Sequence, residues 1–131
     1  MAQSNVETLR AMYEALGKGD MESVRAALAE NCHWNLGGDN LVSGHYSGKE
    51  DIMDLFASLK ELTRGTYWVE LDEISGEGDT LTAQTKVSGE RDGSYGEYVT
   101  QGSWMFIDGK MHSFSESYPD EASVDNFWRS F

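Results

Sequence analysis

A carboxylate set among aromatic residues is the first feature of this sequence that could do chemistry. After the Asp-Gly dipeptide at 108–109, which is typical of a β-hairpin turn, the alternation predicts that His112, Phe114, Glu116 and Tyr118 lie on one side of a strand. Desolvation there would raise the pKa of Glu116, so that it could serve as a general acid or base near neutral pH. A strongly twisted strand end would instead leave Glu116 in solvent. Tyr118 could donate a hydrogen bond to a ligand oxygen or simply close the core.

The histidines do not predict a metal centre. His112 and Glu116 are four residues apart, which is about 13 Å along a strand and too far for both to hold one ion. His33 is isolated in the sequence. His45 falls in the glycine-rich stretch 37–47, which we expect to be a loop over the mouth of a pocket, where this side chain could touch a ligand. We therefore expect neither a metal nor another cofactor.

The first arm of the hairpin, residues 94–107, has two possible registers. If 108–109 is a two-residue turn, the face of Glu116 also carries Gln101, Ser103, Met105 and Ile107. If residues 107–109 form a type I turn with a glycine bulge, that face carries Tyr98, Thr100, Trp104 and Phe106. We favour the bulge because it places the larger rings inside. The opposite face is then small and mixed in character, which suits a flat two-fold contact.

Helices are predicted mainly in the first half of the chain. Residues 4–7 (Ser-Asn-Val-Glu) match a capping box and open an amphipathic helix that Gly17 ends. Asp20 can cap a second, shorter helix. Residues 47–50 (Ser-Gly-Lys-Glu) form another capping box, opening a helix that Gly65 ends. The first two helices should form a hairpin.

Strands dominate the second half. A short strand at 32–36 comes before the third helix, and alternating segments at 66–74 and 80–90 lead into the hairpin at 94–118. Asp120 can cap a terminal helix after the last strand. Helices followed by an antiparallel meander, with no repeat or linker, predict one α+β domain over residues 1–131.

Composition narrows the possible partners. Ten Lys and Arg against 23 Asp and Glu give a formal charge of −13, which would repel a nucleic-acid backbone. The scattered acids are typical of a solvated surface. Cys32 is the only cysteine, so no intrachain disulfide is possible, and no apolar run resembles a signal peptide or approaches a membrane span of about 20 residues. We expect a cytoplasmic protein that binds neither nucleic acid nor membrane.

Five short motifs, in their order and spacing, resemble a known family. They are Tyr-Glu-Ala-Leu-Gly-Lys-Gly-Asp at 13–20, His-Trp-Asn-Leu at 33–36, Ser-Gly-Lys-Glu at 47–50, Asp-Gly-Lys-Met at 108–111 and Ser-Tyr-Pro-Asp-Glu at 117–121. Together they resemble the SnoaL-like polyketide cyclase branch of the nuclear-transport-factor-2-like (ketosteroid-isomerase-like) superfamily.

This resemblance implies a fold without deciding a function. The fold would be α+β and cone-shaped, with three helices of the N-terminal half packed on a strongly curved antiparallel sheet and a short C-terminal helix. It would enclose a hydrophobic pocket and form a homodimer through the outer face of the sheet. Members of the superfamily include cyclases, isomerases, epoxide hydrolases and pockets without chemistry.

Departures from the family patterns remove some activities. Ketosteroid isomerases have a tyrosine and two aspartates where this chain has Met12, Leu36 and a glycine or serine at 102–103, so the sequence does not support steroid enolisation. Epoxide hydrolases of this fold use an Arg-x-Asp pair, which is absent from the sheet region here. SnoaL-type cyclases rely on a carboxylate that Glu116 resembles, although their usual neighbouring histidine is Phe114 in this chain.

Three functions follow from these observations. We favour an acid/base isomerase, cyclase or hydrolase that acts on an apolar oxygen-bearing molecule, with Glu116 as the catalytic residue. The alternatives are a non-catalytic binding protein for a small hydrophobic ligand and a dimeric interaction module whose cavity is filled by its own rings. The residues expected to line the pocket are Met12, Trp34, Leu36, His45, Phe56, Tyr98, Thr100, Trp104, Phe106, His112, Phe114 and Tyr118.

Overall fold

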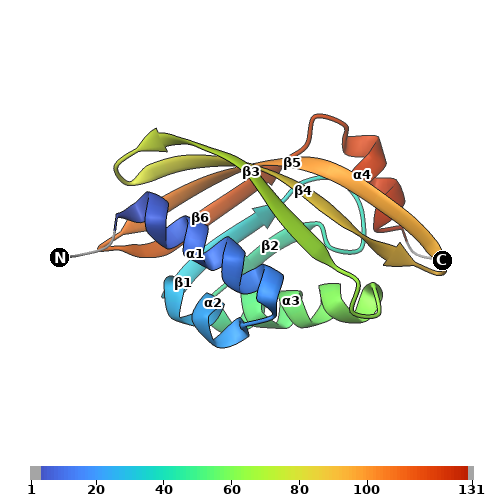
Figure 1. Ribbon diagram of the computed structural model, residues 1–131, viewed down its shortest axis with the longest axis horizontal. Coiled ribbons are helices and arrows are strands. Elements are labelled where there is room, and N and C mark those ends of the chain that lie inside the picture. Colours follow the sequence, from blue (N-terminus) through green and yellow to red (C-terminus); the bar gives the residue numbers. More distant parts are fainter. Residues whose placement is uncertain (1–3, 130–131) are drawn as a thin grey trace.

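The computed structural model describes residues 4–129, which form helices and a single curved sheet (Figure 1). The α+β prediction is confirmed. In chain order, the elements are α1 (Asn5–Lys18), α2 (Met21–Ala27), β1 (Leu28–Leu36), β2 (Gly44–Ser47), α3 (Lys49–Leu62), β3 (Trp68–Glu77), β4 (Thr80–Arg91), β5 (Ser94–Ile107), β6 (Lys110–Ser117) and α4 (Glu121–Phe127).

The six-stranded sheet has the order β2-β1-β6-β5-β4-β3. Its neighbours pair antiparallel except β1 and β6, which run parallel, so the sheet is mixed and not wholly antiparallel as expected. A parallel pair needs a long crossover connection, and here everything from β2 to β5 supplies it. This arrangement places the last strand, with Glu116, in the middle of the sheet.

Local signals fix most helix starts. The Ser4 hydroxyl accepts a hydrogen bond from the Glu7 amide at 3.1 Å, as the capping box predicts. Asp20 likewise accepts from the Ser23 amide at 3.2 Å. The prediction of a second capping box at residues 47–50 is wrong, because Gly48 occupies the N-cap of α3 without any side-chain hydrogen bond. Ser47 is instead the last residue of β2.

Pairing between segments that are distant in sequence lengthens one strand and creates another, and the local sequence pattern predicts neither. β1 begins at Leu28 and not at residue 32, and residues 44–47 form the edge strand β2 inside the stretch expected to be a loop. In this pairing Asn35 lies opposite His45. His45 is therefore a strand residue and not part of a lid.

The β5–β6 hairpin places its irregularity away from the turn. Asp108 and Gly109 both have positive φ, at 50° and 79°, and Ile107 pairs with Lys110, so the turn has two residues and the favoured bulged turn is wrong. The register shifts further along, because Phe106 pairs with Met111 and Met105 with Ser113. His112 is thus the extra residue of a β-bulge in β6. The aromatic residues of β5 that we expected inside, such as Trp104 and Phe106, are nevertheless buried. The bulge at His112 shifts the pairing of β6 with β5 by one residue, as the predicted bulge at the turn would have done.

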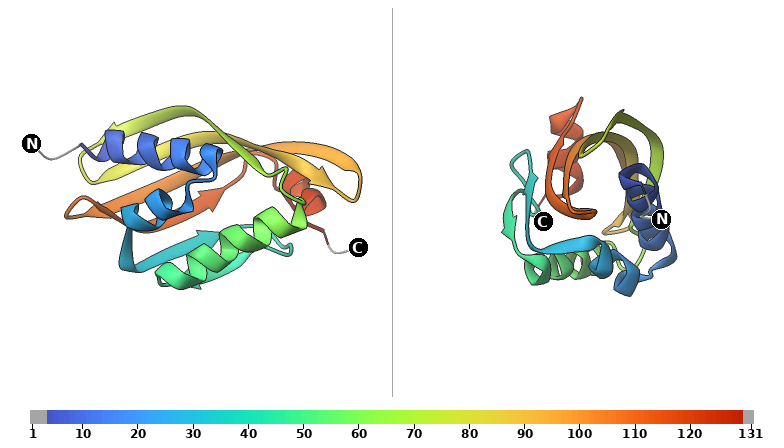
Figure 2. Two further views of the ribbon diagram at one scale, coloured as in Figure 1. Left: turned by 60° about the horizontal axis from the view of Figure 1, so that its bottom comes forward. Right: turned by 90° about the vertical axis from the view of Figure 1, so that its left-hand side faces the viewer.

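The curved sheet wraps around a core that the helices close. Figure 2 shows the sheet curling while α1 and α3 cover its open side. Trp104, Phe106 and Trp128 are each 1% exposed or less at the centre. Within residues 4–129, no helix is long and apolar enough to cross a membrane.

Candidate functional site

A small internal cavity lies where Glu116 faces the helices. Its volume is about 30 Å³, which is room for water but not for an organic ligand. Glu116 is the one carboxylate among its lining residues. These are Met12, Tyr13, Leu16, Trp34, Phe56, Tyr67, Val69, Thr85, Val87, Trp104, Phe114 and Glu116.

Aromatic rings fill most of the interior beside this cavity. Trp34, Phe114 and Trp104 form one row across three strands, with ring centroids 4.7 Å and 4.2 Å apart. Phe56 of α3 meets the face of this row, 5.4 Å from Trp34. The Trp34 indole N–H is buried without a hydrogen-bond partner among the described residues. Such an unpaired donor is costly, and a ligand oxygen or a water would satisfy it.

Glu116 lies in the next row of the sheet, opposite Leu36 on β1 and Gly102 on β5. Gly102 has no side chain, and the Phe114 ring takes that space, because a Cβ at Gly102 would lie 2.3 Å from the ring. Ala83 follows on β4 in the same row. Gly102 therefore makes room for the Phe114 ring, which lines the same cavity as the Glu116 side chain.

Burial raises the pKa of Glu116 to about 7, and a hydrogen bond donated by Tyr118 partly opposes this rise. The side chain is partly exposed by surface area, yet protein atoms surround the carboxylate closely. At a pKa near 7, the protonated and ionised forms are both populated at neutral pH. The carboxylate can therefore take up a proton in one step and return it in another.

The negative charge of Glu116 affects the pKa of four tyrosines. Burial raises the pKa of Tyr13, Tyr67, Tyr98 and Tyr118, and the neighbouring carboxylate raises each one further. All four therefore stay protonated near neutral pH and can donate hydrogen bonds.

Two of these hydroxyls are held in place by indoles. Trp104 Nε1 donates to the Tyr13 hydroxyl at 3.2 Å, and Trp128 Nε1 donates to the Tyr98 hydroxyl at 2.8 Å. Each hydroxyl thus accepts one bond, and its own proton remains for a second acceptor. The result is an oriented set of donors around a single base.

The structure separates the predicted site residues into three groups. Met12, Trp34, Phe56, Trp104, Phe114 and Glu116 line the cavity together. Leu36, Tyr98, Thr100, Phe106 and Tyr118 are buried or partly buried around it without lining it. The last two, His45 and His112, meet His33 away from the cavity.

The expectation that His112 shares the side of Phe114 and Glu116 is wrong. The bulge at His112 breaks the alternation, so that Met111 is fully buried and the His112 ring lies against His33, 6.0 Å away. Alternation over 112–118 cannot reveal such a bulge, since it depends on pairing with β5.

Six lining residues were not predicted. Tyr13 and Leu16 belong to the apolar stripe of the first helix, which was the available signal. The other four come from the β3–β4 side of the sheet, and they are Tyr67, Val69, Thr85 and Val87. Strand alternation predicted buried positions there, but nothing in the sequence indicated a cavity.

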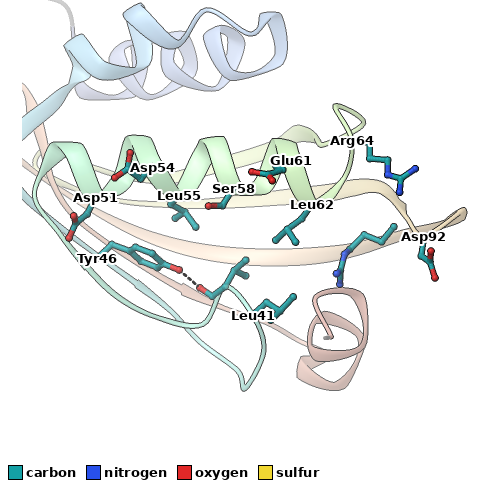
Figure 3. Close-up of a pocket in the computed structure, with 12 residues that line it drawn as sticks. Leu41, Tyr46, Asp51, Asp54, Leu55, Ser58, Glu61, Leu62, Arg64 and Asp92 are labelled. Carbon is teal, nitrogen blue, oxygen red and sulfur yellow. Dashed lines mark hydrogen bonds between the residues drawn. The ribbon is translucent and has the colours of Figure 1, made fainter. Parts of the chain in front are cut away.

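A larger hollow of about 830 Å³ lies outside the core, between α3 and the segment around Leu41 (Figure 3). Asp51 and Asp54 are exposed on the helix surface there, and the Tyr46 hydroxyl donates to the Val42 carbonyl at 2.7 Å. Its carboxylates are solvated, so this hollow has less to offer acid/base chemistry than the inner cavity.

Comparison with known proteins now places the chain. Residues 9–113 match the SnoaL-like domain. The chain belongs to this family. A comparison with the curated proteins finds no match.

Solved structures agree on the fold, which is nuclear-transport-factor-2-like. Bal32a, from a soil-derived mobile gene cassette, is 27% identical with a TM-score of 0.91, over 95% of this chain and 96% of that one. TerC, co-crystallised with polyporic acid, is 18% identical with a TM-score of 0.83, over 96% and 98%. A candidate SnoaL-like polyketide cyclase from Jannaschia sp. CCS1 is 16% identical with a TM-score of 0.74, over 91% of each chain. At these identities the last two likenesses concern the fold alone.

Proposed function

We propose that this SnoaL-like protein is an acid/base enzyme for a small, apolar, oxygen-bearing molecule, with Glu116 carrying the proton. One observation carries the proposal. A lone carboxyl projects into an aromatic interior, where burial raises its pKa to about 7. Burying an ionisable group in this way costs stability, which is typical of a functional position.

The surrounding groups supply complementary roles. Ionised Glu116 removes a proton from a carbon or a hydroxyl, and the protonated acid returns it at another atom of the same molecule. Tyr13, which lines the cavity and is oriented by the Trp104 indole, donates a hydrogen bond to an oxygen on which negative charge develops. These roles fit isomerisation, cyclisation or hydration, and none of them needs a further cofactor.

Two proteins that share only the fold provide the analogy for the proposed substrate class. TerC was co-crystallised with polyporic acid, and the Jannaschia protein is a candidate polyketide cyclase. Both point to oxygenated, largely apolar molecules. For such a molecule the cavity of about 30 Å³ must widen, and the unbranched side chain of Met12 is the lining group that can change its rotamer most readily.

The proposal is tested with nitrobenzisoxazole, an apolar oxygen-bearing ring. When a base removes its ring C–H proton, the electron pair of that bond forms a nitrile, the N–O bond breaks, and the opened product is a coloured phenolate. We expect turnover by the wild-type protein to rise with pH through about 7, following the ionisation of Glu116. Glu116→Gln should lower the rate at least about 100-fold. Glu73→Gln, which changes an exposed glutamate of β3, is the matched control and should keep the wild-type rate.

The size of the cavity favours a second candidate, a dimeric interaction module whose interior is filled by its own rings. Val99 and Met105 are exposed on the outer face of β5 and could contact a second copy, forming a homodimer. If nitrobenzisoxazole neither binds nor turns over, and Met105→Glu converts a dimer to a monomer in light scattering, this candidate replaces the enzyme. Equal turnover by wild type and Glu116→Gln would remove the role of Glu116.

A further inference from the structure

All three histidines of the chain meet on the sheet, although His33, His45 and His112 are far apart in sequence. They come from β1, β2 and β6, which are neighbours in the sheet (Figure 1). The rings of His33 and His45 stack with centroids 5.4 Å apart. His33 and His45 are both exposed, and they lie on the face of the sheet opposite the buried Cys32 and Trp34 of β1.

One pair of nitrogen atoms is placed to share a ligand. His33 Nδ1 and His45 Nε2 are 3.4 Å apart. This separation is long for a hydrogen bond, whose usual range is about 2.7–3.2 Å. Two imidazole nitrogens bound tetrahedrally to zinc, each about 2.05 Å from the metal, lie about 3.3 Å from each other. The observed pair therefore has the spacing of two ligands of one tetrahedral ion.

A neighbouring amide sets the protonation of the second ring. His45 Nδ1 is 2.7 Å from Asn35 Oδ1, which is an acceptor, so Nδ1 carries the proton. His45 Nε2 is then left with its lone pair facing His33. An outer partner that fixes the tautomer and orientation of a histidine in this way is typical of metal-binding imidazoles.

We propose that His33 and His45 form a surface zinc site, with Asn35 as its orienting residue. No group of three His, Cys, Asp or Glu side chains within residues 4–129 is placed to hold a metal ion, so the chain supplies two ligands and water completes the tetrahedron. The His112 ring packs edge-on against the His33 ring, with centroids 6.0 Å apart, and it does not complete a three-ligand group with the pair among the described residues.

The chemistry of the pair selects a class of ion. Imidazole suits Zn²⁺ and other transition metals such as Cu²⁺ and Ni²⁺, whereas Mg²⁺ and Ca²⁺ require oxygen ligands, and the tetrahedral spacing of the two nitrogens favours Zn²⁺ within that class. The formal charge of −13 concentrates cations near the surface without choosing among them. A bound ion would link β1 to the four-residue edge strand β2, and so stabilise the folded protein.

The test is calorimetric titration of the full, metal-free chain with zinc chloride. His33→Gln and His45→Gln should each lower the association constant more than about tenfold, and Asn35→Ala about tenfold, as for other outer-shell partners. His112→Gln is the matched control and should leave the constant unchanged. Because the ligands are exposed, these variants should fold, and circular dichroism verifies that they do.

Two further readouts separate this site from cations gathered by an acidic surface. Zinc should raise the melting temperature of the wild type but not of the His33→Gln/His45→Gln double variant, and cobalt should give the visible absorption of a tetrahedral ion only in the wild type. Undiminished zinc affinity in the double variant overturns the proposal. A loss of zinc affinity in His112→Gln that is as large as the loss in His33→Gln or His45→Gln also overturns it.

Discussion

Replacing Glu116 with glutamine should make the protein more stable, and the gain should depend on pH. Burial raises the pKa of Glu116 from 4.5 to about 7, so the folded protein holds this proton more tightly than the unfolded chain does. Between these two pKa values the folded state binds more protons, and the free energy of unfolding therefore falls as pH rises. The full contribution is present below pH 4.5 and is lost above about pH 7.

The size of this effect follows from the shift. A rise from 4.5 to about 7 corresponds to about 3 kcal/mol, at about 1.36 kcal/mol for each pKa unit. Glutamine has nearly the same shape, carries no charge at any pH and can still accept a hydrogen bond from Tyr118. The gain in unfolding free energy of Glu116→Gln over wild type should therefore be about 3 kcal/mol larger at pH 8 than at pH 4. At pH 8 this is a gain of roughly 10 °C in melting temperature.

The assay is urea unfolding followed by tryptophan fluorescence at half-unit steps from pH 4 to pH 8. Glu73→Gln supplies the control, since an exposed substitution should change stability by less than about 0.5 kcal/mol at every pH. A carbon-13 label on the glutamate carboxyls gives the pKa of Glu116 independently. If the stability difference between Glu116→Gln and wild type does not vary with pH, the carboxyl is solvated, and the acid/base proposal loses its basis.

Three other substitutions test the site and the first helix. Tyr118→Phe removes a hydrogen bond that stabilises the ionised form of Glu116, so the carboxyl should titrate above pH 7 in carbon-13 spectra, and an unchanged value would contradict the contact. Gly102→Ala should cost about 1–3 kcal/mol in urea unfolding, because the new Cβ would meet the Phe114 ring; a neutral effect would mean that the ring is free to move. Ser4→Ala should cost about 1 kcal/mol, because the first turn of α1 loses its cap; no loss would show that the cap bond contributes nothing.

Much of the architecture was predictable because its signals are local. Ser4 and Asp20 cap helices through backbone amides only three residues away. Asp108 and Gly109 correctly marked the position of the hairpin, although the turn has two residues and not the glycine bulge that we favoured. By contrast, the serine at 47 looked like a cap but ends a strand, because its segment pairs with β1. The local pattern carries no information about that partner.

The site was predictable in part. Glu116 and its aromatic neighbours follow from strand alternation, which holds from Phe114 onward because the bulge lies before it. The bulge itself depends on how β6 aligns with β5 and β1 at once. The meeting of His33, His45 and His112 depends on the same alignment, so residues that are isolated in sequence become neighbours.

The sequence by itself determined the class of fold, the starts of α1, α2 and α4, and the presence of one carboxylate on an aromatic strand; the predicted helix ends at Gly17 and Gly65 are wrong, because α1 continues to Lys18 and α3 stops at Leu62. Only the tertiary structure decided that β1 and β6 run parallel, that His112 is expelled from the inner face, and that the cavity beside Glu116 measures about 30 Å³. The physical reason is the range of the interactions. Caps, turns and alternation act over a few residues, whereas register, bulges and free volume are set jointly by strands and helices that are distant along the chain.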